Sequence, residues 1–155
     1  MTDAPARLPL AATLLVRDSC LCLAAQRAAR ALARRFDAAL RPVGLTNGQF
    51  SLLMALNRPE PPRISDLAPF LAMDRTTLTA ALKVLEREGL ARTAPDAADR
   101  RNRRVTLTDA GHARLIAALP LWQAAHGALN AALQGVDLAA LATGLDRAAR
   151  APATE

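Results

Sequence analysis

The chain has 155 residues, of which 52% are hydrophobic and only 3% aromatic. Its formal net charge is +6, and arginine supplies every cationic side chain except Lys83. This length and the abundance of alanine and leucine indicate one mostly helical domain with a sizeable core. No N-terminal apolar stretch is long enough for a signal or transmembrane segment, and two cysteines cannot build a disulfide scaffold. We therefore expect a cytoplasmic protein with no membrane partner.

The first predicted helix follows a flexible arm. Residues 1–17 contain two prolines and little periodicity, which indicates the arm. Asp18 or Ser19 can cap a helix with apolar residues at steps of three or four, and Gly44 ends it. The arginines of this helix and its end fall mainly outside the apolar stripe: Arg27, Arg30, Arg34, Arg35 and Arg41.

Two shorter helices are predicted next. Thr46 and Gln49 have the spacing of a capping box, so a second helix begins there. Residues 57–62 hold three prolines and form the first clear loop. Ser65 can cap a third helix over residues 66–72, in which Pro69 removes one backbone hydrogen bond.

A fourth helix is predicted after its N-cap, Asp74, and ends at Gly89 through a left-handed C-cap. Its two faces differ in character. The inner face is apolar, with Leu78, Ala81, Leu82 and Leu85. The outer face is polar, with Arg75, Thr76, Thr79, Lys83 and Arg87.

A basic hairpin follows. Residues 90–93 and 105–107 are predicted to be its two short strands. The connection between them has four arginines within five positions: Arg100, Arg101, Arg103 and Arg104. Thr108 can cap the next long helix, in which Pro120 should produce a kink or a bend, and Asp137 can cap the last helix.

Two short helices followed by a basic hairpin predict a mostly α winged helix-turn-helix with a two-stranded β wing. The major groove of DNA admits one helix, and a narrow minor groove attracts arginines. A charged helix or an arginine-rich loop alone is usually a solvated surface, but the two in this order favour double-stranded DNA as the partner. The predicted DNA-binding residues are Arg75, Thr76, Thr77, Thr79, Lys83, Asp99, Arg100, Arg101, Arg103 and Arg104.

From Leu45 to Gly111 the sequence resembles the multiple-antibiotic-resistance regulator (MarR) family. The segments that carry the resemblance are LTNGQFSLLMAL, ISDLAPFLAMDRTTLTAALKVLEREGL and DRRNRRVTLTDAG. Asp99 and Arg101 are similar to the wing signature of that family, in which the aspartate orients the wing and the arginine enters the minor groove. The resemblance implies a dimeric transcriptional regulator.

The long apolar helices near both ends of the chain independently favour a two-fold dimer, because a small domain must bury them somewhere. We expect a dimerisation region at 18–44 and 109–150 and a DNA-binding lobe at 45–108. The homodimer would act as a repressor on an inverted-repeat operator. The resemblance implies that a small aromatic acid releases the protein from DNA. Arginines of the first helix would bind the carboxylate of that acid.

Two alternatives stay open. Cys22 aligns with a position that resembles the peroxide-reactive cysteine of the organic-hydroperoxide-sensing branch, and a helix N-terminus near Cys20 and Cys22 would favour a thiolate. The chain has no tyrosine to support that thiolate, and small buried cysteines are the simpler interpretation. The other alternative is an architectural protein that binds DNA with little sequence preference.

No enzyme motif is present. The sequence has no glycine-rich phosphate loop, no HExxH and no nucleophile elbow. His112 and His126 stand apart from other ligand-type residues, so no metal site and no cofactor are expected.

Overall fold

The computed structural model describes residues 7–151 and divides into two compact units between Arg34 and Arg35. The first unit contains α1 (Leu10–Ser19) and most of α2 (Leu21–Leu40). The second unit begins within α2. Its further elements are η1 (Arg41–Val43), α3 (Asn47–Leu56), α4 (Ile64–Phe70), α5 (Arg75–Arg87), β1 (Ala91–Pro95), β2 (Arg103–Leu107), α6 (Asp109–Ala132) and α7 (Leu138–Arg150).

The predicted arm at 1–17 is largely helical where it is described. Residues 1–6 lie outside the described part, but α1 begins at Leu10, directly after Pro9. Most residues of α1 are good helix formers, and proline is tolerated at a helix start, so the apolar run folds locally. Asp18 and Ser19 consequently lie at the end of α1. The prediction that one of them caps the next helix is wrong, because neither caps α2. Ser19 donates its hydroxyl to the carbonyl of Leu15.

Helix α3 begins as the capping box predicts. The Thr46 hydroxyl accepts a hydrogen bond from the Gln49 amide, and the Gln49 side chain accepts one from the Thr46 amide. Helix α4 starts two residues earlier than predicted, and Ser65 lies inside it. Pro69 therefore falls in the second turn of α4, and the helix ends at the next residue.

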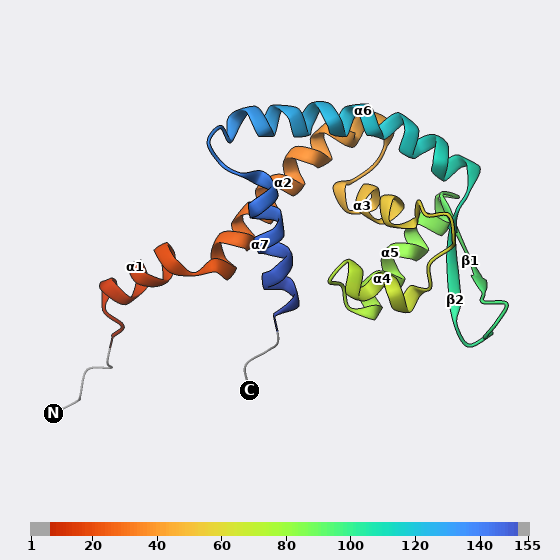
Figure 1. The fold of residues 1–155 in the computed structure, drawn as a ribbon, viewed down its shortest axis with the longest axis horizontal. Helices are drawn as coiled ribbons and strands as arrows, with labels where there is room; N and C mark the ends of the chain where they lie inside the picture. Colours follow the sequence, from red (N-terminus) through yellow and green to blue (C-terminus); the bar gives the residue numbers. More distant parts are fainter. Residues whose placement is uncertain (1–6, 152–155) are drawn as a thin grey trace. The chain divides into compact units, whose positions relative to one another are not determined.

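The second unit has one apolar core. Helix α5 contributes Leu78, Leu82 and Leu85, α4 contributes Leu67, and α3 supplies most of its apolar residues to the same cluster. Figure 1 shows α3, α4 and α5 grouped beside the two strands, with α6 extending along α3. This arrangement confirms the predicted winged helix-turn-helix: two helices joined by a short turn and followed by a hairpin.

The wing is a single antiparallel pair. Ala91 lies opposite Leu107 and Pro95 opposite Arg103, so both strands are longer than the sequence indicates. The prediction limits each strand to the residues that alternate in polarity. The backbone pairing continues beyond them into the polar part of the hairpin. Val105 is fully buried and fixes one face of the wing on the core.

Helix α6 passes through Pro120 as one uninterrupted element. Its buried residues include Leu115 and Ala118, whereas Ile116 is 74% and Leu119 is 41% exposed. In α7, Leu141 is 48% and Leu145 is 43% exposed. Both helices thus present apolar side chains that no residue of the described chain covers.

Within residues 7–151, no helix is both long and apolar enough to cross a membrane.

Candidate nucleic-acid interface

Helix α5 is held at its N-terminus by Asp74. The carboxylate accepts a hydrogen bond from the Thr77 amide at 2.9 Å and a second from the Thr77 hydroxyl. These bonds, the hydroxyl bond first, lower the pKa of Asp74 below its ordinary value. Thr77 therefore belongs to the helix cap, although the sequence predicted it as a DNA-binding residue.

The outward face of α5 gathers four of the predicted DNA-binding residues. They line one shallow groove of about 430 Å³ with Ala80: Arg75, Thr76, Thr79 and Lys83. Arg75, Thr76 and Lys83 are exposed, while Thr79 is half-buried and donates its hydroxyl to the Arg75 carbonyl. The opposite face of α5 is fixed in the core by its leucines. Such a helix presents short polar side chains and cations on a rigid support, as major-groove reading requires.

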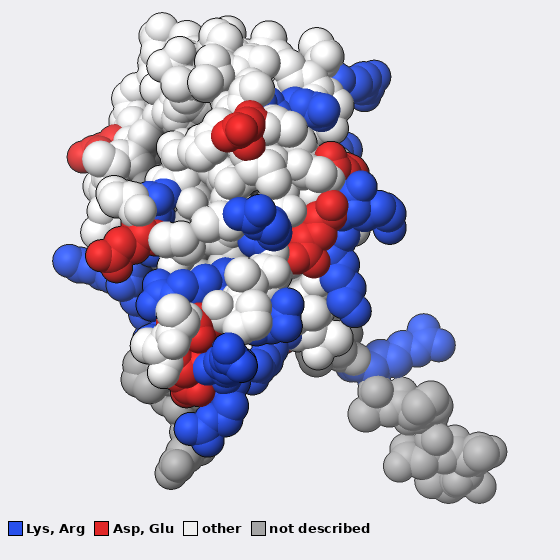
Figure 2. Space-filling view, turned by 90° about the vertical axis from the view of Figure 1, so that its right-hand side faces the viewer, with Lys and Arg blue, Asp and Glu red and all other residues white. Residues whose placement is uncertain are grey.

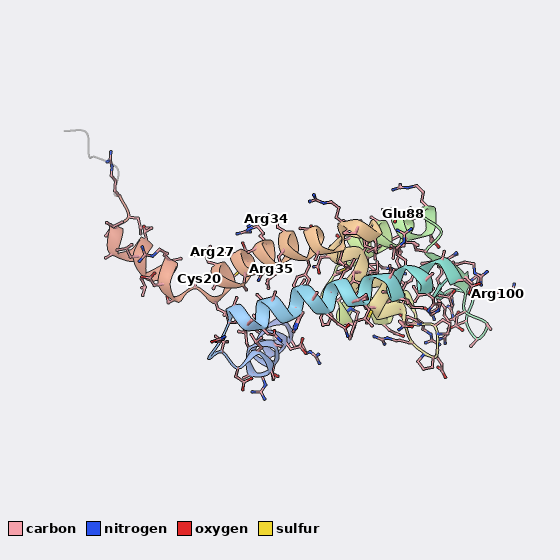
Figure 3. The ribbon with its side chains drawn as sticks, turned by 90° about the horizontal axis from the view of Figure 1, so that it is seen from above. Cys20, Arg27, Arg34, Arg35, Glu88 and Arg100 are labelled. Carbon is pink, nitrogen blue, oxygen red and sulfur yellow. The ribbon has the colours of Figure 1, made fainter. Side chains whose placement is uncertain are left out.

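The turn of the wing is organised by Asp99. Its carboxylate accepts hydrogen bonds from the Arg101 backbone amide at 3.0 Å, the Arg101 guanidinium at 3.3 Å and the Asn102 side-chain amide at 3.1 Å. The Arg101 side chain is still 94% exposed. Arg100 lies beside it and is also exposed (Figure 3). The aspartate therefore orients an arginine that remains free to contact a ligand, as the resemblance implies.

Arg104 is not at the wing tip, where the sequence placed it. It lies in β2, and its guanidinium binds the Asp96 carboxylate at 3.1 Å and the Pro61 carbonyl at 2.7 Å. Arg103 is exposed on the same strand, opposite Pro95. Of the four wing arginines, Arg100 and Arg101 occupy the turn, Arg103 extends from the strand, and Arg104 anchors the hairpin.

Asp96 is the residue that sequence reasoning missed. Its side chain is only 3% exposed and accepts hydrogen bonds from the Ala98 amide and from Arg63, while Arg104 adds a second ion pair. The bond from Ala98, helped by the two arginines, lowers the pKa of Asp96 despite its burial. Arg63 immediately precedes α4, so this carboxylate joins the base of the wing to the helix-turn-helix. No sequence pattern links Asp96 to a residue 33 positions earlier.

Figure 2 shows the side of the molecule on which Lys and Arg side chains gather, mostly in its lower half, while much of the upper part is uncharged. On this face the cations are therefore concentrated in one part of the surface. A polyanion would be attracted to such a surface.

The sequence predicts both cysteines in the first turn of one helix, but only Cys22 lies there. Cys20 is the non-helical residue between α1 and α2, and its Sγ accepts a hydrogen bond from the Leu23 amide at 3.4 Å. Cys22 is exposed in the first turn of α2, and the Gln26 side chain donates to its Sγ at 3.2 Å. Neither thiol is a buried core residue.

An aromatic groove lies between α3, the end of α4 and α6. Its volume is about 560 Å³, and it is lined by Phe50, Phe70 and Trp122, three of the four aromatic residues of the chain, together with Met54 and Arg58. Phe50 and Trp122 stack with their ring centroids 6.2 Å apart, and the Arg58 guanidinium lies 4.7 Å from the Phe70 centroid. Aromatic walls beside one cation suit an aromatic anion.

The ligand-type side chains do not converge on a metal. Among the described residues, no three His, Cys, Asp or Glu side chains lie close enough together to hold an ion. His126 instead stacks on Trp122 with the ring centroids 4.7 Å apart.

Comparison with known proteins decides the family. The MarR family model matches residues 45–102, which run from the residue before the α3 cap into the wing turn. The structure of the transcriptional regulator MosR of M. tuberculosis in complex with DNA is 38% identical, covers 86% of this chain and 100% of that chain, and has a TM-score of 0.72. The chain belongs to the MarR family.

Two further relatives support this membership. The transcriptional repressor CouR bound to a 23-mer DNA duplex is 29% identical, with a TM-score of 0.76 and coverage of 94% of this chain and 100% of that chain. The transcriptional activatory protein BadR of Rhodopseudomonas palustris is 38% identical over 93 residues, which are 57% of this chain and 53% of BadR. The chain spans about half the length of the first curated relatives it matches. MarR proteins are DNA-binding regulators and not enzymes, in agreement with the sequence analysis.

Proposed function

We propose that this protein is a sequence-specific transcriptional regulator that binds an inverted-repeat operator as a homodimer and represses transcription. The observation that carries the proposal is the polar outward face of α5 next to a wing whose Asp99 orients the exposed Arg101. The structures of the relatives MosR and CouR, which are 38% and 29% identical to this chain, are complexes with DNA. These complexes support DNA as the partner of this chain.

The dimer is proposed from the uncovered apolar side chains of α6 and α7. Ile116, Leu119, Leu141 and Leu145 are all at least 41% exposed, and exposed apolar patches mark interaction surfaces. A two-fold dimer places one α5 of each subunit in successive major grooves, roughly 34 Å apart. An operator with two half-sites about one helical turn apart follows from that geometry.

Selection of genomic fragments by the purified protein tests specificity. We expect the selected fragments to share a palindrome that competes far better than random DNA of equal length at equal salt. Equal competition by random DNA would contradict the proposal and would favour the architectural alternative. Transcription from the selected promoter, with and without the protein, then distinguishes a repressor from an activator.

The aromatic groove is proposed as the effector site. An aromatic carboxylate could lie in this groove against the exposed Phe70 while its anion approaches Arg58. Binding would favour one separation of the two α5 helices and so lower DNA affinity.

The test measures release of operator DNA by benzoate and cinnamate for the wild type and for Arg58→Gln, with Arg147→Gln as the matched control. We expect release from the wild type and the control but not from Arg58→Gln. The effector proposal fails if neither acid releases DNA at millimolar concentration.

Cys22 supports a second candidate function, an oxidant-sensing regulator. Its thiol is exposed and accepts a hydrogen bond from Gln26, so an oxidant can reach it. Operator binding is measured before and after treatment with cumene hydroperoxide in the wild type, Cys20→Ser and Cys22→Ser. Loss of binding in the wild type that Cys22→Ser prevents would support the sensor. Equal behaviour of the three proteins would reject it.

A further inference from the structure

Helix α2 carries a row of arginines on one face. Arg27, Arg30 and Arg34 are spaced by three and four residues, so they lie on the same side of the helix, and all three are exposed. We call these three residues the arginine row. At about 1.5 Å of rise per residue, the row is roughly 10 Å long between its outer Cα atoms. Figure 3 labels Arg27 and Arg34 along α2.

The arginine row borders a groove within the first unit. The groove has a volume of about 580 Å³ and is lined by the row and by three alanines, Ala24, Ala28 and Ala31. Alanine side chains end at Cβ, so no large group fills the space beside the guanidinium groups. The only polar side chains in the groove lining are therefore cationic.

The arginine row has no counterion within the described residues. Residues 21–36 contain no Asp or Glu. The acidic residues on either side are engaged elsewhere, because Asp18 binds Arg17 and Asp37 accepts a hydrogen bond from the Asn47 amide. By contrast, Arg63, Arg101 and Arg104 each form an ion pair near the wing.

Like charges at this spacing repel one another and destabilise a helix. An anion with several charges would remove that repulsion at all three positions together. Guanidinium groups match phosphate oxygens with paired hydrogen bonds, and a row about 10 Å long can contact more than one phosphate.

We propose that the arginine row is a binding site for a polyphosphate group, separate from the face of α5 and from the wing. The shared chemistry is that of linked phosphates, which either a free nucleotide-like ligand or the DNA backbone can supply. The row lies outside the residues that line the aromatic groove and outside all of the residues assigned to DNA reading. The DNA-backbone source rests on the proposed function, whereas the binding of a free polyphosphate does not.

The test compares three full-length proteins. The row variant carries Arg27→Gln, Arg30→Gln and Arg34→Gln, and the control variant carries Arg7→Gln, Arg147→Gln and Arg150→Gln, so both lose the same net charge. Glutamine is a good helix former and removes the like-charge repulsion, so the row variant should fold, which circular dichroism checks.

The first measurement is calorimetric titration with inorganic tripolyphosphate, with sulfate at equal ionic strength as the reference. We expect at least a tenfold loss of tripolyphosphate affinity in the row variant and a much smaller loss in the control variant.

The second measurement is the salt dependence of DNA affinity for the same proteins. A slope reduced by about 0.9 for each lost phosphate contact in the row variant alone would identify the DNA backbone as the source. An unchanged slope together with weaker tripolyphosphate binding would identify a free polyphosphate ligand. The proposal is overturned if the two variants behave alike in both measurements.

Discussion

Single side chains at the wing divide between contact and support. Arg101 is held by Asp99 through its backbone amide and its guanidinium but keeps 94% of its side chain exposed, so it is available for a phosphate or the minor groove. Arg104, three residues later, is bound to Asp96 and to a backbone carbonyl. Two arginines in one basic run therefore have different roles.

Replacing Arg101 tests the contact role. Arg101→Ala should weaken DNA binding and reduce the slope of log affinity against log salt by about 1, because one cation no longer displaces counterions. Fluorescence anisotropy at several salt concentrations measures both quantities. Arg147→Ala, at an exposed position of α7, serves as the control and should leave the slope almost unchanged. An unaltered slope in Arg101→Ala would show that the wing arginine does not contact DNA.

Asp96 tests the support role through pH. The folded protein lowers the pKa of Asp96, so its carboxylate stabilises the fold at pH values above the ordinary aspartate pKa of about 3.9. That contribution is lost as the pH falls through the lowered pKa. Asp96→Asn should therefore unfold at a lower Tm than the wild type at pH 7, and the two proteins should converge in strong acid. A Tm difference that is the same at pH 7 and pH 3 would contradict the assignment. Glu60→Gln, at an exposed position outside the helices, is the comparison variant.

At the scale of elements, the start of α6 depends on a close backbone approach. A Cβ atom on Gly111 would lie 2.1 Å from the Leu90 carbonyl oxygen, which belongs to the backbone and cannot rotate away. The Thr108 amide also donates to that carbonyl, and the Thr108 hydroxyl caps α6 at Gly111. The wing and α6 are thus joined at one narrow point.

Two glycines in the same helix give a matched pair of variants. Gly111→Ala should destabilise the protein by about 3 kcal/mol, because the core must shift to admit the methyl group. Gly127→Ala meets no atom within 4 Å and should stabilise α6 by up to about 1 kcal/mol, since alanine is the better helix former. Urea denaturation monitored by circular dichroism measures both. If both variants were equally stable, the close approach at Leu90 would not constrain the fold.

At the scale of the whole molecule, the uncovered apolar side chains of α6 and α7 determine the expected assembly. Leu145→Glu places a charge where the proposed dimer buries a leucine, and should convert the protein to a monomer at micromolar concentration. Thr143→Glu introduces the same charge at another exposed position of α7, nearly on the opposite side, and should remain dimeric. Sedimentation velocity distinguishes these states. A wild-type monomer, or a Leu145→Glu dimer of unchanged affinity, would contradict the proposed dimer.

Local sequence rules determined much of this protein. The caps at Thr46, Asp74, Thr108 and Asp137 are where the sequence predicts them, because each side chain bonds to a backbone amide within three residues. The amphipathic pattern of α5 separated its core leucines from the outward polar face for the same reason: helical spacing alone decides which side chains share a face. The wing pattern and the family resemblance then predicted the winged helix-turn-helix.

Only the tertiary structure decided which polar residues of the wing stay exposed and which are bound inside the fold. The roles of Asp96 and Arg104 depend on Arg63 and Pro61, which are more than 30 residues away in sequence. Contacts over such a separation follow from how α4 and the wing pack together, and packing is a property of the whole chain that no local pattern contains.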